Sequence, residues 1–461
     1  MLARFHCEPL DLWHFLARDL VEATIRVRLD FAARLDVAAL RQALELCLRS
    51  CPLLATRFQS GFWRCRWVAQ PSLSHDWLRV APAGGGSGGS GDSGSSGGPA
   101  CFEAVGPFEA AVAAAFAGGL DVTAGPQVRV TLVRGPEGDS LVLLVSHQAM
   151  DAAGLKDFMT EFGRLYTAIA RGQTPRPAPP QTRSLTPILR TLPWRRRLRL
   201  LPTAPNSRGR DRSPGIERAA GPGRTVVVRI GEADFAAARR AAKALGGTVN
   251  HLLLAVAGRA ACARAGLDHV DLPFTVDLRQ FAPATAQFGP TNLVANAWAR
   301  VPGSGSLPDA VRAVAAGTAD VRERDELWAG LDLLRFCQTA FPSYFIRRTY
   351  GASVKLQPFL FTNSGIWPRE CVTFGEPAYQ VTASAGFKPS PALQINAITF
   401  DGALQLTASV QADEAGAAEV EALLQAMADD LVDLGRTAPG AAAEAAAAAA
   451  AEPAGAGRTR A

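Results

Sequence analysis

The sequence of 461 residues contains no apolar run long enough to cross a lipid bilayer. Its most hydrophobic stretches, such as the one that begins at His251, are short and contain arginine, whereas a membrane-spanning helix needs about 20 mostly apolar residues. The first residues lack the cationic start, the apolar middle and the small-residue cleavage site of a secretory signal. We therefore expect a cytoplasmic protein with no integral membrane segment.

The eight cysteines form no CxxC pair and have no histidine cluster beside them. Structural zinc sites depend on such spacings, so we expect no metal centre. Cys47 and Cys51 are one helical turn apart, which fits a packed helix face better than a metal site. Reduced thiols are the expectation for a cytoplasmic protein.

The composition is that of a globular protein, with 48% hydrophobic and 20% charged residues, and its length allows two domains with substantial cores. The net charge of +6 comes mostly from arginine. This charge can attract phosphate groups, but no nucleic-acid-binding module accompanies it, so we expect no nucleic-acid partner.

Two segments have too few apolar residues to order themselves. The glycine and serine tract at residues 84–99 predicts a flexible surface insertion in the first domain. It satisfies the GxSxG and GxGxxG patterns, but no buried strand precedes it and no helix follows, so we interpret both matches as accidental. The alanine-rich residues 436–461 predict a poorly ordered tail.

A histidine lies where a buried strand meets a helix. Residues 141–145 are a short run of apolar residues with branched side chains, which is typical of a buried strand. From Ala152 onward, apolar residues follow at helical spacing. His147 ends the strand and Asp151 follows four residues later. A neutral imidazole there can accept a proton from a substrate. The alternative is a core histidine followed by a helix-capping aspartate.

The stretch at residues 120–154 resembles the entry to the active site in the condensation-like, thioester-dependent acyltransferase superfamily, whose motif is written HHxxxDG. Residues 35–58 and 246–260 resemble two other segments of that superfamily. The motif here is imperfect, since Ser146 replaces the first histidine and Ala152 the glycine. The superfamily includes nonribosomal peptide synthetase condensation domains, wax-ester synthases, polyketide-associated acyltransferases and chloramphenicol acetyltransferase.

The resemblance implies an α/β fold with mixed α+β sheets: two chloramphenicol acetyltransferase-like lobes that form a V, with a tunnel between them. The first lobe is expected at residues 1–175 and the second at residues 224–435. Between them, residues 176–223 are rich in proline and arginine, and we expect an irregular crossover in which few apolar residues pack.

The resemblance also assigns roles to single residues. It makes His147 the general base and pairs Asp151 with an arginine, for which Arg279 is the candidate. A capping aspartate and a solvated arginine in unrelated places are the alternative. Backbone amides around Gly154 and the side chains of Asn363 or Ser364 are candidate oxyanion donors, although these residue types also favour turns.

Three further groups of residues are interpreted from the sequence. Asn292 and Trp298 are expected to be core or turn residues rather than substrate contacts. A serine next to a histidine in a strand faces the other way, so Ser146 and His147 are no nucleophile and base pair. The cluster of Arg195, Arg196, Arg197 and Arg199 is a candidate dock for the phosphates of coenzyme A or for an acidic carrier protein; a solvated basic loop or a membrane-surface contact is the alternative.

The expected function is transfer of an acyl group from a coenzyme A or acyl carrier protein thioester to the hydroxyl or amine of a small-molecule acceptor. The thioester is a co-substrate, and no cofactor is expected. One alternative is a stand-alone condensation protein that forms amides or esters. The other is a condensation-like binding module that does no chemistry.

Overall fold

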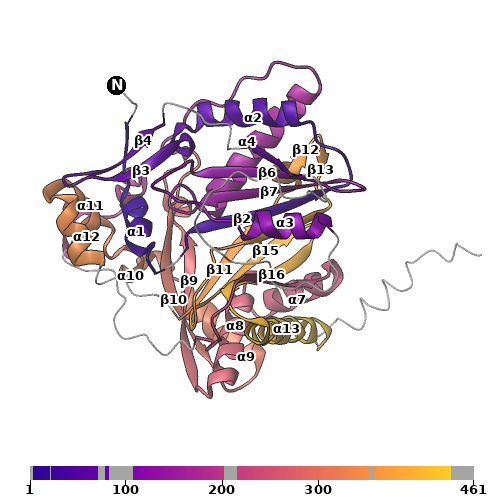
Figure 1. The fold of residues 1–461 in the computed structure, drawn as a ribbon. Helices are drawn as coiled ribbons and strands as arrows, with labels where there is room; N and C mark the ends of the chain where they lie inside the picture. Colours follow the sequence, from indigo (N-terminus) through magenta and orange to yellow (C-terminus); the bar gives the residue numbers. More distant parts are fainter. Residues whose placement is uncertain are drawn as a thin grey trace, which may run out of the picture.

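A computed structural model describes residues 4–20, 22–70, 78–81, 107–201, 215–351 and 358–437. The expected insertion at residues 84–99 and the expected tail beyond residue 437 lie outside these ranges. Two large mixed sheets, one of five strands and one of six, organise the described residues (Figure 1). The expected α/β class with mixed sheets is confirmed.

The five-stranded sheet contains the strand that leads to His147. Its order is β14 (Gln380–Ser384), β2 (Thr24–Phe31), β7 (Asp139–Ser146), β6 (Val128–Arg134) and β5 (Leu78–Ala81). Every residue of β7 is buried, as its continuous apolar sequence predicts. Leu141, Leu143 and Val145 face the core under α2 (Val37–Ser50) and α4 (Ala152–Ala170), whereas Val142 and Leu144 pack with α3 (Pro107–Ala117). The alternation of a strand thus buries both faces of β7.

The six-stranded sheet forms the second core. Its order is β10 (Val294–Pro302), β9 (His269–Asp277), β11 (Phe359–Ile366), β15 (Leu393–Phe400), β16 (Ala403–Gln411) and β8 (Gly223–Ile230). The helices α7 (Glu232–Ala244), α8 (Val249–Ala265), α9 (Leu307–Thr318) and α13 (Glu414–Thr437) pack with it (Figure 1). The Asp-Gly pair predicts the β15–β16 hairpin, and this prediction is confirmed: Asp401 and Gly402 both have positive φ, 46° and 78°.

One strand from the second half of the chain joins the first sheet. After β11 the chain forms η5 (Arg369–Val372) and β12 (Thr373–Phe374) against α4. It continues through β13 (Glu376–Pro377), which pairs with β12, and then β14 pairs antiparallel with β2. Gly163 in α4 permits this approach, because a Cβ atom there would lie 2.1 Å from the carbonyl oxygen of Thr373. The two sheets therefore share a continuous segment of chain.

The crossover is more ordered than its composition suggests. It contains α5 (Thr186–Leu189) and α6 (Trp194–Leu200), and its apolar residues enter the second core. Leu185, Ile188 and Leu189 are almost fully buried, so the expectation that few apolar residues pack there is wrong. Pro187 lies in the first turn of α5, where a missing N–H group costs nothing.

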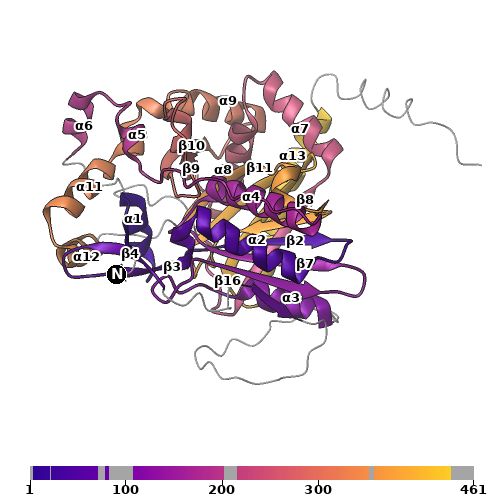
Figure 2. The same cartoon turned by 90° about the horizontal axis from the view of Figure 1, so that it is seen from above.

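Smaller elements surround one end of the molecule (Figure 2). A three-stranded sheet has the order β1 (Arg4–His6), β4 (Cys65–Ala69) and β3 (Thr56–Ser60), so the strand expected near residues 62–68 begins later than predicted. The helix α1 (Pro9–Ala17) contacts α11 (Leu331–Ala340) and α12 (Ser343–Gly351). The remaining short helices are η1 (Pro52–Ala55), η3 (Leu278–Phe281), η4 (Val321–Glu323) and α10 (Asp325–Trp328).

No helix within the described ranges is both long and apolar enough to span a bilayer.

Candidate active site

His147 is the first residue after β7 and begins a tight turn. The turn forms because the carbonyl group of Ser146 accepts a hydrogen bond from the amide of Ala149 at 2.9 Å. The amide of His147 donates to the carbonyl of Ala23 at 2.7 Å, and its carbonyl accepts from Nδ2 of Asn292 at 3.0 Å. The backbone of the histidine is thus held by both halves of the chain.

The ring of His147 stacks on a second histidine, His14 of α1. The ring centroids are 4.6 Å apart, with an interplanar angle of 21°. Burial lowers the pKa of His147, an effect that a hydrogen bond to its own carbonyl partly offsets, and burial lowers the pKa of His14 further. Both rings are therefore neutral at neutral pH. Nδ1 of His147 lies 3.5 Å from Nδ2 of Asn292, on the side of that carbonyl.

Both histidines line a cavity of about 250 Å³. Its walls are mainly apolar and come from α1, β10, α11 and the loop between β14 and β15. Charged residues at its wall are Glu22, Glu326 and Lys388. The cavity therefore combines an apolar surface with a neutral imidazole that can accept a proton, which is typical of a small-molecule site.

Asp151 caps α4 and does not act as a free carboxylate. Its Oδ1 accepts from the amide of Gly154 at 2.9 Å, and its Oδ2 accepts from the amide of Leu293 at 2.7 Å. The same Oδ2 accepts from Nη1 of Arg279 at 2.8 Å, so the structure brings Asp151 and Arg279 together. Arg279 also donates from Nη2 to the carbonyl of Thr291. All of these contacts hold the loop after His147 in shape, and none of them points to a substrate.

The Asp151–Arg279 pair is buried, with side-chain exposures of 1% and 15%. Burial alone would lower the pKa of Arg279, but the nearby carboxylates of Asp151 and Asp277 outweigh it and raise that pKa. Loss of one member would leave the other charged and poorly solvated.

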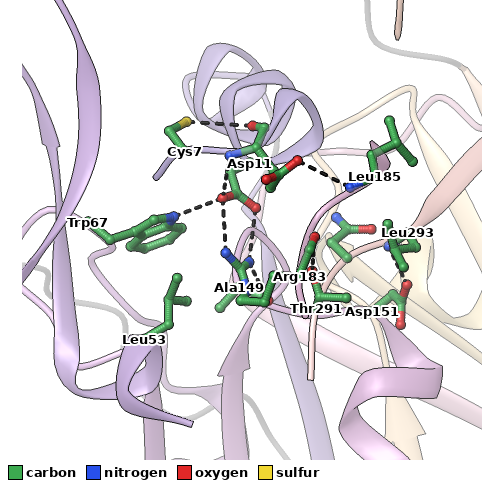
Figure 3. A network of polar contacts seen from close by, with 12 residues as sticks. Cys7, Asp11, Leu53, Trp67, Ala149, Asp151, Arg183, Leu185, Thr291 and Leu293 are labelled. Atoms are coloured by element: carbon green, nitrogen blue, oxygen red, sulfur yellow. Dashed lines mark hydrogen bonds and ion pairs between the residues drawn. The ribbon is translucent and has the colours of Figure 1, made fainter. Parts of the chain in front are cut away.

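A second buried ion pair supports the loop from the other side (Figure 3). Asp11 of α1 accepts from both terminal nitrogens of Arg183, at 3.1 and 3.3 Å, and from Nε1 of Trp67 at 2.8 Å. Arg183 then donates to the carbonyl of Ala149 at 3.1 Å. His14, Asp11 and Arg183 were not predicted from the sequence. The signal for the first two was a histidine and an aspartate inside the apolar stretch that forms α1.

The candidate oxyanion donors are not available in the cavity beside His147. The amide of Gly154 is consumed by Asp151, so its assignment as an oxyanion donor is wrong. A Cβ atom at Gly154 would lie 2.8 Å from the backbone nitrogen and oxygen of Thr291, so close approach of two chains explains this glycine. Neither Asn363 nor Ser364 lines the cavity. Oδ1 of Asn363 accepts from the amide of Gly365, as expected for the turn alternative, whereas Oγ of Ser364 donates to Oδ1 of Asn396 on the neighbouring strand β15.

Two residues interpreted as core or turn residues are buried and also lie next to the site. Asn292 contacts His147 directly, and Trp298 lines the cavity although only 7% of it is exposed. Asn292 is 2% exposed and does not line the cavity, which agrees with its interpretation as a core or turn residue, and it also holds the backbone of His147. Ser146 is buried, and its Oγ has no hydrogen-bond partner among the described residues, which agrees with its facing away from the cavity.

Three of the four clustered arginines are paired with carboxylates. Arg197 binds Asp332 at 2.7 Å, and Arg199 binds Asp325 at 2.8 Å. Arg196 bonds to both Glu323 and Asp325, whereas Arg195 lies over the ring of Trp194. These contacts tie α6 to α10 and α11. The cluster thus has a structural role, and docking of a donor's phosphates stays a prediction.

Histidine, cysteine and acidic side chains within the described ranges form no group that could hold a metal ion.

The fold is that of condensation domains. The chain is similar to the first condensation domain of the CDA synthetase, with a TM-score of 0.64 and 16% identity over 95% of this chain and 97% of that one. It is equally similar to TRI3 trichothecene 15-O-acetyltransferase from Fusarium sporotrichioides, with a TM-score of 0.64 and 16% identity over 94% and 96% of the two chains. Polyketide synthase associated protein 5 from Mycobacterium tuberculosis aligns with a TM-score of 0.57 and 15% identity over 89% and 94%. No family model and no curated protein matches the sequence.

Proposed function

From the condensation-domain fold as premise, we propose that this protein is an acyltransferase in which His147 is the general base. The donor is a thioester of coenzyme A or of a carrier protein, and the acceptor is a small molecule with a hydroxyl or amine group. The observation that carries the proposal is the position of His147: a neutral ring, fixed by its backbone, that lines a mainly apolar cavity. Solved structures with this fold include an acetyltransferase and condensation domains.

The proposed reaction uses the neutral imidazole of His147 as a base. Nε2 of His147 accepts the proton of the acceptor as its oxygen or nitrogen attacks the thioester carbonyl. The tetrahedral intermediate then expels the thiolate, which takes the proton back from the imidazolium. A positioned base of this kind contributes about a hundred- to ten-thousandfold in rate.

The other polar residues act through the position of the ring. Asn292 holds the carbonyl of His147, while Asp151 with Arg279 and Asp11 with Arg183 hold the loop that follows. They are positioning residues, because their bonds go to the backbone or to each other. A fixed base avoids the entropic cost of ordering the loop at each turnover.

Thiol release from a panel of acyl thioesters, in the presence of small alcohols and amines, tests the proposal. We expect H147A to lower the rate by at least about a hundredfold. The matched control is H6A, since His6 is an exposed histidine on β1. If H147A keeps most of the wild-type rate, His147 is not the base.

The same assay distinguishes an acyltransferase from the two alternatives, a stand-alone condensation protein and a binding module that does no chemistry. A stand-alone condensation protein would release thiol only when both the acyl group and the acceptor are attached to carrier proteins. A binding module would bind a thioester without releasing any thiol.

A further inference from the structure

A lysine lines the same cavity as His147. Lys388 lies in the loop between β14 and β15, and its backbone is anchored on β16: its amide donates to the carbonyl of Ser409 at 3.1 Å, and its carbonyl accepts from the amide of Gln411 at 2.9 Å. With the backbone held in this way, the side chain of Lys388 forms part of the cavity wall.

The two carboxylates at the cavity wall already have cationic partners. Glu22 pairs with Arg26 at 2.5 Å and accepts the amide of Phe387 at 3.0 Å. Glu326 pairs with Arg324 at 3.2 Å. The ammonium group of Lys388 forms no hydrogen bond and no ion pair with any of the described residues. The wall therefore has one positive charge without a matching carboxylate.

That charge persists at neutral pH. Burial lowers the pKa of Lys388 to about 8, while the charge of Glu22 acts in the opposite direction. His14 and His147 face the same space and are neutral, so they add no positive charge of their own. An ammonium group without a partner at the wall of a mainly apolar cavity is poorly solvated, and a bound anion would compensate its charge.

We propose that the cavity binds an acceptor that carries a carboxylate, with the carboxylate on Nζ of Lys388, the apolar body against the leucines of the wall, and the hydroxyl or amine near His147. This inference rests on the proposed function for the identity of the ligand as the acceptor. The leucines of the wall are Leu10, Leu20, Leu327, Leu331, Leu334, Leu360 and Leu393. A volume of about 250 Å³ is slightly below the range of about 300–1,000 Å³ that is usual for ligand pockets, so the acceptor is small.

Calorimetric titration with octanoate and with 1-octanol tests this inference without any acyl transfer. The two probes share an apolar chain and differ in charge. We expect K388M to weaken octanoate binding about tenfold or more, the usual effect of losing a charge-assisted hydrogen bond, and to change 1-octanol binding less than about twofold. K388R should keep most of the octanoate affinity. The control is K243M, since Lys243 is exposed on α7.

A measurement on the unmodified protein covers the case in which K388M does not fold. Octanoate affinity should fall as the pH rises through about 8, because Lys388 loses its charge there, whereas 1-octanol affinity should stay constant. Equal loss of both ligands in K388M, or octanoate binding that is insensitive to pH, would overturn the inference. If octanoate binding depends on Lys388 but H147A does not impair thiol release, the proposed base fails while the carboxylate site stands.

Discussion

Replacing Arg279 with methionine should destabilise the protein by about 3 kcal/mol or more, since breaking a buried ion pair typically costs about 3–5 kcal/mol. Asp151 is 1% exposed and would keep two backbone donors, but it would lose the guanidinium group that pairs with it. The carbonyl of Thr291 would lose a donor as well. We place the cost at the lower end because Arg279 is 15% exposed, so water can partly replace it.

Urea unfolding measures this cost, and R300M is the matched control. Arg300 pairs with Asp271 across β10 and β9 of the same sheet, but its side chain is 69% exposed, so its loss should cost about 1 kcal/mol or less. The double variant D151N/R279M should be more stable than the sum of the single changes predicts, by about 1 kcal/mol or more. If R279M costs no more than R300M, the pair does not stabilise the histidine loop, and this account of Asp151 is wrong.

Two further predictions concern the same loop. G154A should destabilise the protein by about 1–3 kcal/mol, because the new methyl group would meet the backbone of Thr291; G317A in α9, which meets nothing within 4 Å, should be neutral or slightly stabilising in the same thermal unfolding experiment. Because the pKa of His147 is lowered, kcat/KM should be constant near neutral pH and fall only as the pH drops through that lowered pKa, below the ordinary histidine value of about 6.5. A pH-rate profile whose acid limb lies above pH 7 would contradict a neutral buried base.

The sequence predicted those features that depend on neighbouring residues. The apolar run of β7, the helical spacing of α4 and the Asp-Gly turn of the last hairpin are local patterns, and each forms where the pattern is. The loop that contains His147 was located for the same reason, because it is the junction of two such patterns. Arg279 was proposed as the partner of Asp151 only from the resemblance, since 128 residues separate them.

The features that the sequence analysis missed depend on distant segments. Arg183 and Asp11 are 172 residues apart, and neither lies in a pattern that specifies the other. The pairing of β14 with β2 joins segments from opposite ends of the chain, although β14 alone looks like any short alternating strand. At Gly154 a local pattern led to a wrong prediction. A glycine close to the candidate base suggested an oxyanion donor, but its amide donates to the carboxylate of Asp151 in the helix cap.

The charge of Lys388 affects the pKa of His147, and this coupling makes the proposed site favour acidic acceptors. Burial is the main cause that lowers the pKa of His147, and the positive charge of Lys388 adds a smaller effect in the same direction. A carboxylate bound to Lys388 would offset this smaller effect, so the pKa of His147 would rise somewhat, while burial would still hold it below its ordinary value. The imidazole would thus become a stronger base when an acidic acceptor is in place. Acceptors without a carboxylate would leave the ring at its lower basicity, so the same lysine would favour acidic acceptors both in binding and in proton transfer.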